Sequence, residues 1–169
     1  MLIRMISSIH KWDNSIVNRN DAYIPADAIS DLRTKDNKLS VWAVNSVAEI
    51  DDIVVALALG RDNVSKLSLI TIDDTNLPPM GISLDNEKGE APGLCEEILS
   101  KHHNLVELDY WRIGFFADYL LTLVQADQLK TYTRNDVKNL LTRYKDNGKI
   151  ITDDVKAGIQ KDMGWVSQQ

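Results

Sequence analysis

The chain has 169 residues, of which 44% are hydrophobic and 26% are charged, and its formal net charge is −6. This length and composition are typical of one globular domain with its own core, and we expect residues 1–169 to form a single domain. The acidic balance argues against direct nucleic-acid binding, because proteins of that class carry an electropositive surface.

The cysteine content and the hydropathy indicate the cellular compartment of the protein. A single cysteine, Cys95, leaves no partner for an internal disulfide, which fits a reducing compartment. The first residues lack the long apolar stretch of a signal peptide. The most apolar helical candidate, residues 114–124, is too short to span a bilayer and contains Asp118. We therefore expect a cytoplasmic protein without a membrane partner.

The first half of the chain predicts strands around one well-defined helix. Residues 3–9 predict a short strand, and residues 39–44 and 67–72 are apolar and β-rich, as buried strands are. Between the latter two, apolar side chains recur on one face of a helix over 46–59, which starts with the capping-box pair Ser46 and Glu49. This order predicts a βαβ unit, whose two strands pair in parallel.

The rest of the chain predicts a long loop and then mainly helices. Residues 73–93 are rich in proline and glycine, with a short strand near 80–84, and so long a loop is often functional. A helix from Gly93 is expected to end at His102 and His103, and a strand follows over 104–108. The fold class is therefore α/β or α+β, with a sheet of three to five strands. Residues 1–110 form its mixed part, and residues 111–169 form its mainly helical part.

The four tryptophans are expected to have structural roles, apart from one. Trp42 lies within a predicted strand and belongs to the core. Trp12 and Trp165 lie near the two ends of the chain, and we expect them to hold these ends against the body of the protein; the alternative is that they anchor a partner. Trp111, at the start of a predicted helix, is a candidate anchor for a partner, as exposed aromatic residues often are.

Two adjacent acids, Asp73 and Asp74, follow the strand at 67–72, which is where open α/β sheets place ligands. Adjacent residues of a strand point to opposite faces, so the pair lacks the spacing of two carboxylates on one side. A metal-dependent hydrolase that uses Asp73 with Asp85 or Glu87 is one alternative. We favour surface acids and expect neither a metal nor a cofactor.

A zinc site is not supported either. Cys95, His102 and His103 are close in sequence, but a structural zinc site needs four ligands. At the end of a helix, the two imidazoles would instead interact with the negative end of the helix dipole.

The uneven distribution of charge suggests a function. Between Val41 and Trp111, thirteen acids stand against four bases, and such a negative field attracts a basic partner. We predict a non-catalytic binding protein that docks on and neutralises a basic protein, as an immunity protein or inhibitor of a nuclease toxin does. The residues assigned to recognition are seven acids and two aromatic residues: Asp73, Asp74, Asp85, Glu87, Glu90, Glu96, Glu97, Tyr110 and Trp111.

Two further interpretations stay open. The acids can serve only to keep the protein soluble. A structural or assembly subunit that uses the helical last third as its interface is the other alternative.

Overall fold

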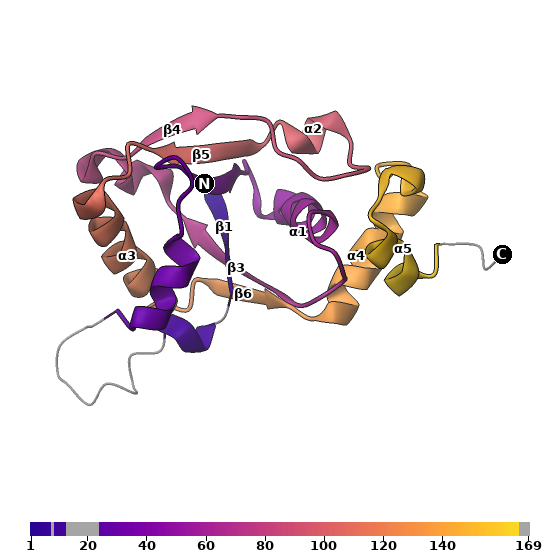
Figure 1. Ribbon diagram of the computed structural model, residues 1–169, viewed down its shortest axis with the longest axis horizontal. Helices are drawn as coiled ribbons and strands as arrows, with labels where there is room; N and C mark the ends of the chain where they lie inside the picture. The colour runs from indigo at the N-terminus through magenta and orange to yellow at the C-terminus, as the bar shows by residue number, and fades with distance from the viewer. Residues whose placement is uncertain (8, 13–23, 166–169) are drawn as a thin grey trace.

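Short apolar segments build a sheet at the centre of the molecule. The computed structural model describes residues 1–7, 9–12 and 24–165. Six strands form one antiparallel sheet in the order β4-β5-β2-β1-β3-β6 (Figure 1). They are β1 (Leu2–Ile6), β2 (Leu39–Ala43), β3 (Leu67–Ile72), β4 (Ser83–Asn86), β5 (His102–Val106) and β6 (Leu129–Tyr132). The sheet thus has more strands than the three to five that the sequence predicts.

Strand β1 lies in the middle of the sheet and buries apolar side chains on both faces. Leu2 and Ile3 are fully buried on opposite faces, and Leu2 pairs with Ala43 of β2 and with Ile72 of β3. β2 and β3 both run antiparallel to β1, so they share a direction without pairing. The predicted parallel pairing of these two strands is therefore wrong, because β1 is inserted between them.

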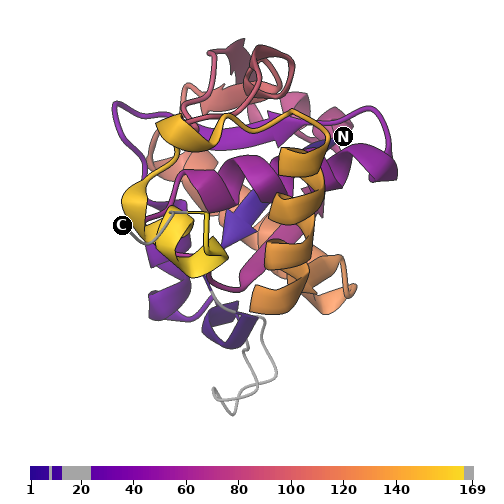
Figure 2. The same cartoon turned by 90° about the vertical axis from the view of Figure 1, so that its right-hand side faces the viewer.

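Helices cover both faces of the sheet (Figures 1 and 2). The core on one face includes side chains from α1 (Ile50–Leu59), α2 (Glu96–Leu99), α4 (Arg134–Asp146) and α5 (Ala157–Met163). The core on the other face includes side chains from α3 (Tyr110–Gln125) and from the 3₁₀ helices η1 (Ile9–Trp12) and η3 (Ala26–Leu32). The remaining 3₁₀ turns are η4 (Val47–Glu49), η5 (Asp74–Asn76), η6 (Pro78–Met80) and η7 (Thr152–Asp154). The last third of the chain therefore packs on both faces of one sheet.

The two edges of the sheet differ most from expectation. The helix predicted to reach His103 is limited to α2, and His102–Val106 forms β5, which pairs with β2 and β4. His102 and His103 therefore project to opposite faces of the sheet, and neither ends a helix. β6 at the other edge is a strand of four residues within the region predicted to be helical, and of its side chains only Tyr132 is buried.

The tryptophans lie largely as predicted. Trp42 is buried in the core, and Trp12 is buried with its indole N–H donating to a carboxylate oxygen of Asp31 at 3.0 Å. Trp165 packs, partly buried, against the core that contains α1. In the part of the chain that the structure describes, no helix combines the length and the apolar character needed to cross a membrane.

Candidate binding groove

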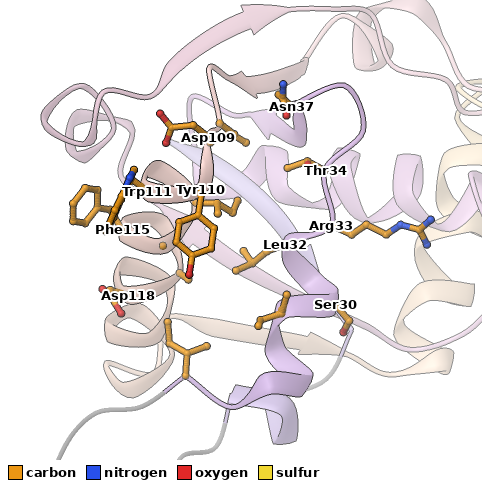
Figure 3. A pocket seen from close by; sticks show the side chains of 16 residues that line it. Ser30, Leu32, Arg33, Thr34, Asn37, Asp109, Tyr110, Trp111, Phe115 and Asp118 are labelled. Atoms are coloured by element: carbon orange, nitrogen blue, oxygen red, sulfur yellow. The ribbon is translucent and has the colours of Figure 1, made fainter.

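A groove of about 990 Å³ runs between η3 and the first half of α3 (Figure 3). Its walls are mainly apolar and include Ile24, Ile29, Leu32, Leu108, Tyr110, Trp111, Ile113 and Phe115. Figure 3 shows Tyr110 between the two helices, while Trp111 lies on the outer side of α3. The two aromatic rings meet edge to face, with 5.8 Å between their centroids. The groove and its outer wall thus form one continuous aromatic surface.

The chain turns sharply before α3, and this turn places the aromatic residues at the start of the helix. Glu107 has a φ of 63°, a left-handed conformation that ends β5 and redirects the backbone. Asp109 then caps α3, because its carboxylate accepts the backbone N–H of Arg112 at 2.8 Å. The Arg112 guanidinium in turn donates to the carbonyl of Glu107 at 2.8 Å. Tyr110 and Trp111 are therefore the first two residues of a firmly anchored helix.

The aromatic side chains lie off the buried face of α3. The residues of α3 that face the sheet are Phe116, Ala117, Leu120 and Leu121. By contrast, the exposed fraction is 82% for Tyr110, 72% for Trp111 and 54% for Phe115, and Ile29 across the groove is 62% exposed. These are four of the seven large hydrophobic side chains that are exposed among the described residues. Exposed apolar side chains are thus concentrated at this one place.

The charges around the groove are mixed, with one acid left unpaired. Asp109 forms an ion pair with Arg112 at 3.4 Å. Asp118 lines the groove and is exposed, and it has no ion pair among the residues described. Arg33 is on the opposite rim and points away from the aromatic residues in Figure 3.

The adjacent acids at the end of β3 hold the local backbone. The Asp73 carboxylate accepts the backbone N–H of Thr75 at 3.0 Å and its hydroxyl at 2.7 Å. These hydrogen bonds from Thr75 lower the pKa of Asp73 below its ordinary value. Asp74 pairs with the α-amino group of Met1 at 3.2 Å. Both acids therefore already have partners within the chain.

Most of the other predicted acids are also paired. The Lys38 ammonium lies 3.3 Å from Asp85 and 3.2 Å from Glu87. Glu96 lies 2.5 Å from the ammonium of Lys88.

Three of the predicted acids are exposed and form no ion pair among the described residues: Asp73, which accepts hydrogen bonds from Thr75, and Glu90 and Glu97. The acidic surface is thus weaker than the formal count of carboxylates suggests.

The structure does not bring the predicted site residues together. Asp73 follows β3 while Asp85 and Glu87 belong to β4 and its end, and β1, β2 and β5 lie between these strands. Four strand spacings correspond to about 19 Å, which is far beyond the reach of one metal ion. Residues 1–7, 9–12 and 24–165 contain no cluster of three or more His, Cys, Asp or Glu side chains suited to a metal.

The sequence predicts part of the groove. It indicates Tyr110 and Trp111 as recognition residues but does not indicate Ile29 and Phe115. Phe115 lies one position before the buried Phe116. A helical projection of residues 110–125 places Phe115 outside the apolar stripe that contains Phe116. This position would have predicted an exposed aromatic side chain.

Comparisons of the chain with family models, with curated proteins and with solved structures find no match.

Proposed function

We propose that this protein is a cytoplasmic binding protein whose groove docks, without taking part in catalysis, on a basic protein partner and neutralises it. A nuclease toxin suits this chemistry, because its nucleic-acid-binding surface is basic. The protein would then serve as its immunity protein or inhibitor. The observation that carries the proposal is the exposure of Tyr110, Trp111 and Phe115 in the first turns of α3.

Exposed aromatic residues on a rigid helix favour protein binding. Tyrosine and tryptophan dominate the energetic centres of protein interfaces, because they bury a large area with little loss of side-chain entropy. Fully burying one large apolar side chain contributes about 1.5–3 kcal/mol. The Asp109 cap and the buried stripe of α3 hold these side chains in place before binding, which lowers the entropic cost of association.

The charge of the protein supports a basic partner. The chain carries a net charge of −6, and Asp118 beside the groove has no ion pair among the described residues. Glu90 and Glu97 add unpaired acids elsewhere on the surface. We assign close contact to the aromatic residues and long-range attraction to the unpaired acids, since opposite fields mainly speed association. Asp74, Asp85, Glu87 and Glu96 contribute less, because each is paired with a cation.

Of the two alternative functions, the geometry of the sheet disfavours the hydrolase. A hydrolase built on Asp73 needs Asp85 or Glu87 beside it, and three strands lie between them. An assembly subunit that uses the last third of the chain needs an exposed apolar surface there. Within the described part of residues 111–169, the exposed large apolar side chains are Trp111 and Phe115 of the groove and Ile151, so an assembly role would use the same aromatic surface, and the charge of the partner distinguishes the two functions.

Binding experiments with matched variants test the proposal. Tagged protein is used to isolate a stoichiometric basic protein from the native host, and the purified pair is then titrated by calorimetry. We expect Tyr110→Ala with Trp111→Ala to weaken binding at least ~100-fold, since two central aromatic residues commonly contribute 2 kcal/mol or more each. Raising the salt from about 0.05 to about 0.5 M is expected to slow association, because it screens surface charges.

The control is Ile151→Ala, which removes an apolar side chain that is 61% exposed and lies outside the groove. Binding is expected to be unchanged in this variant. An affinity that survives the double substitution in the groove would overturn the assignment of the site. A partner that is acidic, or bound equally well at both salt concentrations, would overturn the assignment of the partner's charge.

A further inference from the structure

A second pocket, of about 440 Å³, contains a serine and a histidine in hydrogen-bonding contact. The Oγ atom of Ser40 lies 2.5 Å from Nε2 of His102, and Nδ1 of the same ring lies 2.6 Å from the backbone oxygen of Glu87. Ser40 is on β2 and His102 on the neighbouring strand β5. Their side chains lie on the same sheet face as Trp42, opposite the face that α3 covers. The contact therefore lies on the other face of the sheet from α3, and Arg33 is the residue that lines both this pocket and the groove.

The backbone oxygen decides which atom of the contact donates. A carbonyl oxygen only accepts hydrogen bonds, so Nδ1 of His102 must carry the proton in this contact. Nε2 of the neutral ring is then an acceptor, and the Ser40 hydroxyl must donate to it. A nucleophile hydrogen-bonded to a base, with the base oriented by a third group, is the arrangement that activates catalytic serines.

The surroundings hold the imidazole in this orientation. The ring of Trp42 meets that of His102 edge to face, with 5.0 Å between centroids. Gly89 presses its backbone against both: a Cβ atom there would lie 2.6 Å from Cη2 of Trp42 and 2.9 Å from Cβ of His102. The Glu87 carboxylate accepts a hydrogen bond from the side-chain amide of Asn104 at 2.6 Å. This bond holds Glu87 in place, and the backbone oxygen of Glu87 orients His102.

The pocket is open and is more positive than the protein as a whole. Ser40 is exposed. The lining includes four cationic side chains, Arg33, Lys35, Lys38 and Lys88, and three acidic ones, Asp36, Glu87 and Glu90. The pocket thus has a formal charge of +1 in a chain of net charge −6. Arg33 and Lys35 have no ion pair among the described residues, so they are available to a ligand.

We propose that Ser40 is a nucleophile for acyl transfer, activated by His102, and that the pocket takes a small carboxylic ester with a negatively charged group. Its volume lies within the range of small-molecule sites, about 300–1,000 Å³. Arg33 and Lys35 attract the anionic group and offset the negative charge that develops on the carbonyl oxygen. This proposal does not depend on the function of the groove.

The reaction has two balanced steps. Ser40 Oγ attacks the ester carbonyl carbon as its proton passes to Nε2 of His102; the bond to the alcohol oxygen then breaks, and that oxygen takes the proton from Nε2. Water next attacks the acyl-serine carbonyl and gives a proton to Nε2. The bond from Oγ to the acyl carbon breaks, Oγ recovers the proton, and the carboxylic acid leaves.

Labelling with a fluorophosphonate probe tests the nucleophile. We expect the intact chain to gain one covalent label, mapped to Ser40 by peptide mass spectrometry. His102→Gln is expected to slow labelling at least ~100-fold, the lower range of general-base effects. His103→Gln is the matched control, because that side chain faces the other side of the sheet, and it is expected to keep the wild-type rate within about twofold.

Ester hydrolysis tests the substrate class. p-Nitrophenyl hemisuccinate is compared with the neutral p-nitrophenyl acetate, and Arg33→Gln with Lys35→Gln is expected to abolish the preference for the anionic ester. Thermal melting shows that each variant is folded. Absence of a label at Ser40 in folded protein, or a label that forms equally fast in His102→Gln, would overturn the proposal of a nucleophile. Equal hydrolysis of both esters would overturn the assigned charge of the substrate.

Discussion

The ammonium group of Lys101 lies 2.7 Å from the carboxylate of Asp52, and this contact joins the start of β5 to helix α1. The second oxygen of Asp52 accepts the hydroxyl of Tyr144 from α4 at 2.6 Å. Asp52 is only 8% exposed, so the pair is largely shielded from water. One carboxylate therefore links three segments that are far apart in the sequence.

Removing this carboxylate should destabilise the protein strongly. Asp52→Ala leaves the Tyr144 hydroxyl unsatisfied and Lys101 with Glu49 alone, at 2.9 Å. Breaking a buried ion pair from one side costs roughly 3 kcal/mol or more of the free energy of unfolding. Urea denaturation measures the loss. Glu96→Ala removes half of the exposed pair with Lys88 and is expected to cost about 1 kcal/mol or less. Similar losses in the two variants would contradict the structural importance of Asp52.

The same carboxylate should make stability sensitive to acid. Burial raises the pKa of Asp52, but the hydrogen bonds from Lys101 and Tyr144 lower it by more. The pKa therefore lies below its ordinary value. A lower pKa in the folded state means that the unfolded chain binds the proton more readily. The stabilisation is therefore present above about pH 4 and is lost as the pH falls below this value. Melting temperatures between pH 7 and pH 3 are expected to fall less steeply for Asp52→Asn, and parallel curves would contradict this.

Two glycines in helices should respond in opposite ways to the same substitution. A Cβ atom on Gly158 in α5 would lie 2.0 Å from the backbone oxygen of Asp62, whereas one on Gly114 in α3 would meet nothing within 4 Å. Gly158→Ala is expected to lower the free energy of unfolding by about 1–3 kcal/mol through overpacking. Gly114→Ala is expected to raise it by about 0.5–1 kcal/mol, because alanine loses less entropy in a helix. Denaturation of both variants tests the close packing of α5, and a change of the same sign in both would contradict it.

Helix caps give a further pair of matched variants. Thr133 and Asp136 form a reciprocal capping box at the start of α4, with the Thr133 hydroxyl accepting the backbone N–H of Asp136 at 3.2 Å. Thr133→Ala is expected to cost about 1 kcal/mol. The predicted capping box at Ser46 is not formed: the Ser46 hydroxyl makes no cap, and Glu49 accepts the backbone N–H of Asn45, at 3.3 Å, and not that of Ser46. Ser46→Ala is expected to change the free energy of unfolding by less than about 0.5 kcal/mol, and an equal cost for both variants would contradict the caps described.

The two caps also show how far local sequence patterns predict this fold. The strand at 67–72 matches β3, and residues 39–44 predict β2 to within one residue, because both are continuous apolar runs. The capping-box pattern at Ser46 has the right residues, yet Glu49 also lies 2.9 Å from Lys101, which is distant in sequence. The insertion of β1 between β2 and β3 depends in the same way on non-local pairing, which no local pattern contains.

The candidate sites were predictable to different degrees. Tyr110 and Trp111 were identified from residue type and position, and both lie on the groove. The acids were identified by charge, but whether an acid is free depends on distant partners, as Lys38 shows by pairing with Asp85 and Glu87. The contact of Ser40 with His102 depends on the register of β2 against β5. The sequence predicts a helix at His102, so it does not predict this strand pairing.

Fluorescence quenching tests the exposure of the groove without a partner. Trp111 is 72% exposed, whereas Trp12 and Trp42 are 1% and 5% exposed. Trp111→Phe is expected to remove most of the emission that acrylamide quenches, and to change the free energy of unfolding by less than about 0.5 kcal/mol, as surface substitutions usually do. Trp42→Phe is the control: it should leave the quenchable fraction in place and destabilise the core by about 1 kcal/mol or more. An unchanged quenching constant in Trp111→Phe would mean that this side chain is covered in solution, and the groove would then not be open to a partner.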